Sequence, residues 1–158
     1  MIGLLKSGAR QMFLIEWKYT ESYSNEDKYI QERAARYDHL ITADGSPFIE
    51  GVDARVFYFE PFYQLMRQTL FGDQSLAVRD YGISEYKHIH VVPMQNKELR
   101  ERITSPQLTG KDLHDAWVKV LKDKNRFIGV TPEDLFEPVR GMADTKSILH
   151  YLEERYWR

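Results

Sequence analysis

The apolar positions at the start of the chain predict two paired β-strands. Residues 2–5 are mostly apolar, and Ser7-Gly8 then supplies a pair that favours a turn. The run 11–19 follows, continuously apolar at first and alternating towards its end. Because side chains alternate between the two faces of a strand, Glu16 and Lys18 share one face. We therefore expect a hairpin whose second strand ends with both charges on the same side.

Helical periods dominate the rest of the chain. Ser24 and Asp27 have the spacing of a capping box, and they predict a helix over 26–40. A longer helix is predicted to begin at Pro61 and to continue to a cap at Gly82. The remaining predicted elements are a strand over 85–92 and helices over 97–103, 111–122, 132–136 and 146–156.

This order of elements predicts an α/β fold with a small mixed sheet flanked by helices. The length suits one domain over 1–158. Its strands fall within a core of about 1–93, and its helical C-terminal part covers about 94–158. A domain of this size buries enough surface to fold without disulfides or structural metals.

Composition narrows the classes of protein. The chain is 42% hydrophobic and 29% charged, which argues against disorder, and no apolar run is long enough for a membrane span. The chain has no cysteine, which excludes disulfides and thiolate ligands. Together with the absence of a signal-peptide pattern in 1–10, this predicts a cytoplasmic protein with no membrane partner. The net charge of −2 means that nucleic-acid binding would need a local basic patch.

The strand-borne Glu16-Trp17-Lys18 is the segment most suggestive of chemistry. A carboxylate can hold Mg²⁺, and the metal can polarise a phosphate and activate water. A lysine beside the metal can orient or deprotonate that water, or neutralise charge in the transition state. A salt bridge exposed on the sheet is the alternative interpretation of the same residues.

Residues 13–23 resemble the E-x-K strand of the PD-(D/E)xK nuclease superfamily, within a bacterial branch described as restriction endonucleases. Further stretches that fit this branch are Arg36-Tyr37, 60–68, 88–93 and 100–106. The resemblance implies a restriction-endonuclease-like core. In it, 13–19 is the third core strand, the helix from residue 26 is the second core helix, and 85–92 is the fourth strand.

The resemblance also implies roles for particular residues. Glu16 would be a catalytic residue and metal ligand, Lys18 the catalytic lysine, and the backbone carbonyl of Trp17 a further metal ligand. The implied cofactor is Mg²⁺ or Mn²⁺, and the implied substrate is DNA. The expected activity is hydrolysis of DNA phosphodiester bonds by a Mg²⁺-dependent endonuclease.

The sequence departs from the superfamily pattern before Glu16. That pattern needs an Asp on the preceding strand, and no Asp or Glu precedes Glu16 here. The first core helix and strand are also missing, so we expect an N-terminally truncated or degenerate member. The alternative function is a catalytically silent nuclease-fold protein that binds DNA or a protein, or that forms a homodimer.

Two groups of polar residues lie on the predicted helices. Gln31, Arg33 and Arg36 follow the E-x-K strand, and two arginines three positions apart share a helix face. They would bind substrate phosphate, or they form a solvated basic face. On the longer helix, the polar side chains of Gln64, Arg67 and Gln68 would contact DNA, or they form a helix surface or dimer contact.

His88 and His90 alternate on the predicted strand and so point to the same side. Two imidazoles at this spacing can begin a zinc or iron site, which then needs a third ligand such as His39, His114 or a carboxylate. Histidines packed on the face of a sheet are the alternative.

Overall fold

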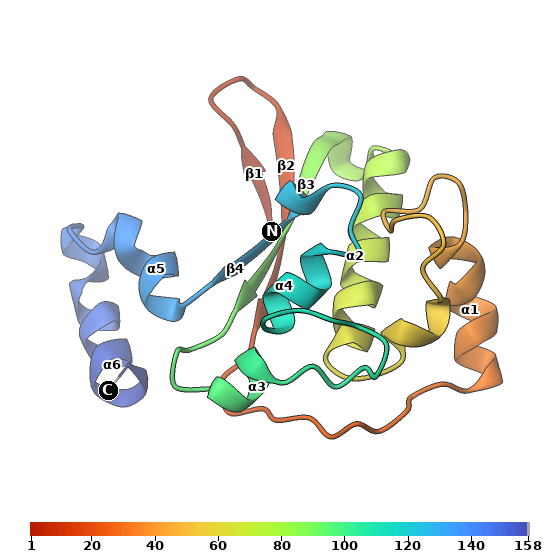
Figure 1. Cartoon of the computed structure of the whole chain (residues 1–158). Coiled ribbons are helices and arrows are strands. Elements are labelled where there is room, and N and C mark those ends of the chain that lie inside the picture. The colour runs from red at the N-terminus through yellow and green to blue at the C-terminus, as the bar shows by residue number, and fades with distance from the viewer. Residues whose placement is uncertain (158) are drawn as a thin grey trace.

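The computed structural model describes residues 1–157, so Arg158, the last residue of the expected domain, lies outside the described residues. Four strands form one sheet in the order β1-β2-β3-β4 (Figure 1). β1 (Ile2–Leu4) is antiparallel to β2 (Arg10–Trp17), whereas β3 (Ile83–Val91) is parallel to β2, and β4 (Phe127–Val130) is parallel to β3. The expected α/β fold with a small mixed sheet flanked by helices is confirmed.

Helices account for most of the remaining regular structure. Within residues 1–157, no helix is long and apolar enough to cross a membrane. The α-helices are α1 (Gln31–Ile41), α2 (Phe62–Ala77), α3 (Lys97–Glu101), α4 (Leu113–Val118), α5 (Pro132–Phe136) and α6 (Lys146–Tyr156). Short 3₁₀ turns cover Ala54–Phe57, Asp80–Gly82, Lys124–Arg126, Glu137–Val139 and Ala143–Thr145.

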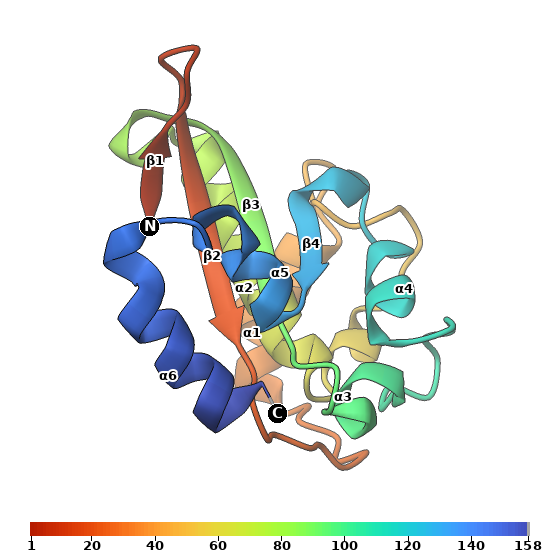
Figure 2. The same ribbon diagram turned by 90° about the vertical axis from the view of Figure 1, so that its left-hand side faces the viewer.

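Different helices cover the two faces of the sheet. Helix α2 packs on one face, where Gly72 lies so close to Tyr86 that a Cβ on the glycine would be 2.6 Å from the ring. On the other face, the rings of Trp17 and Phe136 of α5 have their centroids 6.1 Å apart. Figures 1 and 2 show α1 and α2 on one side of the sheet, and α5 and α6 on the other. Because Glu16 lies on the opposite face to Trp17, it faces α2.

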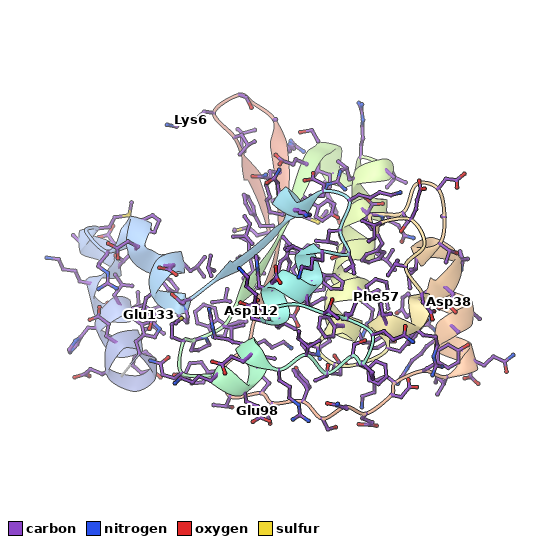
Figure 3. All side chains as sticks on the ribbon, in the orientation of Figure 1. Lys6, Asp38, Phe57, Glu98, Asp112 and Glu133 are labelled. Atoms are coloured by element: carbon purple, nitrogen blue, oxygen red, sulfur yellow. The ribbon has the colours of Figure 1, made fainter. Side chains whose placement is uncertain are left out.

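The main apolar core lies between α2, α4 and β4. The ring centroids of Phe57 and Trp117 are 5.7 Å apart, and those of Trp117 and Phe127 are 6.3 Å apart. All three side chains are buried. Figure 3 shows Phe57 among the interior side chains, whereas Lys6 projects from the tip of the β1–β2 hairpin. This core anchors α2 and β4 beside the end of β3.

The first helix begins later than its sequence pattern predicts. The capping-box spacing places its start at residue 26, but α1 begins at Gln31, and Ile30 at its N-cap makes no side-chain cap. Asp27 is engaged elsewhere, since its carboxylate accepts hydrogen bonds from the backbone of Tyr29 and from Arg55. The predicted start at residue 26 is therefore wrong.

The segment 94–158 is not purely helical as expected, because β4 extends the sheet. Its four residues follow a 3₁₀ turn and lead directly into Thr131, which caps α5 through a capping box with Asp134. So short a strand has no alternating pattern of its own. Phe127 enters the core, which joins the C-terminal half of the chain to the sheet.

The helix that packs on the face of the sheet formed by β2 and β3 is α2, and not α1. It ends at Ala77, several residues before the predicted cap. Arg79 and Tyr81 both have a φ of 51°, a left-handed conformation that interrupts a helix. The turn at Gly82, with a φ of 71°, then leads into β3.

Candidate functional site

The E-x-K residues lie at the carboxyl end of β2, beside the end of β3. The Nζ atom of Lys18 is 2.8 Å from Oε1 of Glu16, and the two side chains are only 8% and 7% exposed. The backbone N–H of Lys18 donates to the carbonyl of Val91, which ties the end of β2 to β3. The prediction that Glu16 and Lys18 share a face is confirmed. The exposed salt bridge that was the alternative is wrong, because the pair is buried.

Two further polar groups hold the ammonium of Lys18. Nζ donates to the hydroxyl of Tyr23 at 3.0 Å and to Oε1 of Gln64 in the first turn of α2. The amide nitrogen of Gln64 also donates to the Tyr23 hydroxyl at 3.3 Å. Burial alone would lower the pKa of Lys18, but hydrogen bonds with Glu16 and Tyr23 and the Glu16 charge raise it above 10.5. Lys18 is therefore an ammonium at neutral pH.

Glu16 lies between the ammonium and two imidazoles. Its Oε2 atom is 3.5 Å from Nε2 of His88, and His90 is its register partner on β3. Burial alone would raise the pKa of Glu16, but the contacts with His88 and Lys18 outweigh burial and hold that pKa at about 2. Glu16 is thus a carboxylate throughout the physiological range.

The residues present fit one part of a magnesium site. Within the described residues, Oε2 of Glu16 is buried with no hydrogen-bond partner, so one carboxylate oxygen is left to accept a cation. The same part of the chain contains no group of three His, Cys, Asp or Glu that could hold a metal ion. Because Mg²⁺ is often held by one or two carboxylates together with substrate phosphates, Glu16 fits as a single carboxylate ligand.

His88 and His90 pack on the sheet as the alternative interpretation described. Both side chains are buried, and the ring centroid of Phe127 lies 5.2 Å from His88 and 6.0 Å from His90. Burial lowers the pKa of His90 to about 4, so its ring is neutral at pH 7. His114 packs on the same phenylalanine from α4, with centroids 5.3 Å apart, but completes no metal site in the part described.

Glu60 adds a second carboxyl group beside this cluster. It precedes the N-cap residue of α2, Pro61, and its Oε2 atom is buried without a hydrogen-bond partner among the described residues. Burial raises the pKa of Glu60, although contacts with Gln64 and the Lys18 charge act in the opposite direction. The site therefore pairs one carboxyl group that is readily ionised, on Glu16, with one that is held closer to neutrality.

Sequence reasoning missed Tyr23 and the role of Gln64. Gln64 was expected to contact DNA or to form part of a helix surface or dimer contact, yet it bonds the lysine directly. Its position offered a signal, since Pro61 marks the start of a helix and Gln64 lies in the first turn. Tyr23 carries no signal, because it belongs to a long segment between β2 and α1 that has little regular structure.

The candidate substrate-binding residues on α1 lie apart from Lys18. Arg33 places its guanidinium 5.3 Å from the ring centroid of Tyr63 and donates to the carbonyl of Lys28 at 2.5 Å. Gln31 and Arg36 are exposed. Among the described residues, no hydrogen bond or ion pair joins these three residues to Glu16 or Lys18.

A comparison with known families assigns the chain. A family model described as a restriction endonuclease associating with ARP matches residues 1–157. The chain belongs to this restriction endonuclease family. No curated protein and no solved structure matches it. In this restriction endonuclease family member, Glu16, Lys18, His88 and His90 form a buried cluster of ionisable residues on the sheet.

Proposed function

We propose that this restriction endonuclease family member is a PD-(D/E)xK-type nuclease that hydrolyses DNA phosphodiester bonds with Mg²⁺ or Mn²⁺. The observation that carries the proposal is the buried Glu16–Lys18 pair, 2.8 Å apart at the carboxyl end of β2. Ligand sites of open α/β sheets lie outside the carboxyl ends of their strands. Burying two opposite charges at this position costs desolvation energy that an apolar pair would avoid, so stability alone does not account for the Glu16–Lys18 pair.

Glu16 would hold the metal, and the backbone carbonyl of Trp17 would be a second protein ligand. When bound, the metal polarises the phosphate and lowers the pKa of a water molecule. Because the described chain supplies a single carboxylate ligand in contact with Lys18, the substrate phosphate would complete the coordination. Metal affinity in the absence of DNA is then expected to be weak.

Lys18 acts as a positive charge in this proposal. Its pKa is raised above the ordinary value, so it remains protonated at neutral pH and is a poor general base. An ammonium held by Glu16, Tyr23 and Gln64 is positioned to neutralise charge that develops on the phosphate. Gln31, Arg33 and Arg36 are proposed to bind backbone phosphates farther along the DNA.

A second candidate function is a catalytically silent module that binds DNA or a protein, or forms a homodimer. The observation that favours it is the closure of the site. Lys18 already occupies Oε1 of Glu16, and both side chains are almost fully buried. In this case the Glu16–Lys18 pair would have a structural role and no catalytic role.

Nicking of supercoiled plasmid with Mg²⁺ or Mn²⁺ separates the two functions. We expect the wild-type chain to nick the plasmid, EDTA to stop it, and Lys18→Ala to reduce the rate by at least about 100-fold. The matched control is Lys87→Ala, because Glu85 and Lys87 repeat the E-x-K spacing on β3, outside the site. If wild type fails to nick with either metal, or if both lysine variants nick equally, the proposed activity is wrong.

A further inference from the structure

A groove runs between α1 and α2 on the side of the molecule that carries Glu16 and Lys18, the proposed catalytic pair. It encloses about 600 Å³ and is lined by Tyr37 of α1 and by Gln64, Arg67, Gln68 and Phe71 of α2. We call it the α1–α2 groove. Its two walls are held together by the ring contact of Tyr37 with Tyr63, whose centroids are 6.0 Å apart.

The groove leads to Lys18 through Gln64. Residues 64, 67, 68 and 71 follow the three- and four-residue spacing that places side chains on one face of a helix. With a rise of about 1.5 Å per residue, this row covers roughly 10 Å of the helix. Gln64 closes one end of the row and bonds the ammonium of Lys18. A chain molecule lying in the groove would therefore point at the catalytic pair.

The charge beside the groove suits a polyanion. Arg33 and Arg67 place their guanidinium groups 5.3 Å and 5.6 Å from the ring centroid of Tyr63. In the part of the chain that the structure describes, neither arginine has a carboxylate partner. Four other arginines do have one: Arg55, Arg102, Arg126 and Arg140. Glu60 is the acidic group at the groove, and burial raises its pKa, which weakens its repulsion of phosphate.

The groove also presents an aromatic face. Phe71 is 56% exposed although it lies in the middle of α2. The side chains next to it in the groove include Gln68 and Gln74, whose amides can donate and accept hydrogen bonds. An exposed ring among amides and an unpaired guanidinium has the composition of a surface that binds unpaired nucleotides.

We propose that the α1–α2 groove binds two or three unpaired nucleotides of a DNA strand and directs that strand towards Lys18. A base stacks on Phe71, Arg67 pairs with a phosphate, and Gln68 bonds a base edge. The inference rests on the proposed function, because it deepens the substrate class from DNA in general to DNA with a single-stranded stretch. An intact duplex offers no free base to Phe71.

Fluorescence anisotropy with a labelled single-stranded oligo(dT) and a blunt duplex of equal length tests the proposal. We expect the single strand to bind the wild-type chain more tightly, and Phe71→Ala to weaken that binding roughly tenfold. Arg67→Ala should lower the slope of log Kd against log salt by about one. The control is Tyr151→Ala, which removes a 49% exposed ring from α6 on the other side of the sheet. Equal binding by Phe71→Ala and wild type, or preference for the duplex, would overturn the proposal.

Cleavage measured on the same samples separates this proposal from the nuclease function. If the groove variants bind normally and the wild type still nicks plasmid, the groove proposal fails and the nuclease function stands. If binding depends on Phe71 and no variant or wild type cleaves, the groove stands and the nuclease function fails.

Discussion

Two E-x-K pairs on adjacent strands share their spacing but differ in their surroundings. The lysine ammonium lies 2.8 Å from the carboxylate in Glu16–Lys18 and 2.9 Å in Glu85–Lys87. The first pair is 7% and 8% exposed, whereas Glu85 is 42% and Lys87 is 21% exposed. The tripeptide spacing therefore does not by itself produce a site.

The difference follows from strand parity and strand position. Glu85 and Lys87 lie near the start of β3, on the face opposite to Tyr86 and α2. Glu16 and Lys18 lie at the end of β2 on the α2 face, where Gln64 meets them. The end of a parallel strand beside a covering helix is where a charged pair becomes enclosed and acquires additional partners.

Breaking the buried pair should give the largest change in stability. Lys18→Met leaves the Glu16 carboxylate buried without its cation, and we expect a loss of about 3–5 kcal/mol in the free energy of unfolding. Lys87→Met should cost under about 1 kcal/mol. Urea denaturation measures both. The double variant Glu16→Gln with Lys18→Met should regain much of the loss, and equal losses for the two lysines would erase the comparison.

The histidine beside the buried pair should make stability depend on pH. The folded-state pKa of His90 is about 4, below its ordinary value of 6.5, so the unfolded chain binds the proton more readily. Stability is therefore lost as the pH falls from about 6.5 to 4, by about 2–3 kcal/mol. Glu16, with a pKa of about 2, loses its contribution only at lower pH.

Urea denaturation of His90→Gln between pH 7 and pH 4 checks this expectation. The variant should flatten the pH dependence in that window. His150→Gln is the matched control, since His150 is 72% exposed on α6. A wild-type chain whose stability does not change between pH 7 and pH 4 would contradict the burial argument.

Removing the third partner of Lys18 should cost less than removing the lysine. Gln64→Leu deletes an acceptor for the buried ammonium, and we expect a loss of about 2 kcal/mol in the free energy of unfolding. Gln74→Leu changes an exposed amide on the same helix and serves as the control. Thermal unfolding followed by circular dichroism compares them. No difference between the two variants would mean that Gln64 does not support the pair.

Salt should change the stability contributions of the two pairs to different extents, and this is the smallest of the expected effects. At low ionic strength Lys87→Ala is expected to cost about 0.5 kcal/mol, and this cost should disappear in about 1 M NaCl because exposed charges are screened. The cost of Lys18→Met should change little over the same range, since buried pairs are screened less. A parallel decline for both variants would show that Glu16 and Lys18 are accessible to solvent.

The first three strands and the charged pair were predictable because their signals are local. Alternation in 11–19 placed Glu16 and Lys18 on one face, and the helix predicted over 132–136 is α5. The family resemblance added the restriction endonuclease assignment, which the family model supports over residues 1–157. The proposed metal and catalytic roles of these residues stay predictions.

The remaining features depend on contacts that no local pattern encodes. Tyr23 reaches Lys18 only because of the path that the segment before α1 takes, with Asn96 donating to the carbonyls of Tyr19 and Glu21. The strand β4 owes its place to the pairing of Phe127 with His88. Similarly, the start of α1 is shifted because Asp27 is engaged by Arg55. In all three cases tertiary contacts set the position, and the spacing of residues along the sequence does not encode those contacts.

The parallel pairing of β2 with β3 has a consequence for folding kinetics. Residues 18–82 separate the two strands along the chain, so their pairing closes a long loop before it gains contacts. The β1–β2 hairpin, by contrast, is local and can form on the microsecond scale. Because Glu16 and Lys18 come into contact with His88, His90 and Gln64 only when β3 and α2 dock, the cluster assembles late. Refolding of this chain should therefore be slow relative to helical proteins of the same length, with the candidate site among its last parts to form.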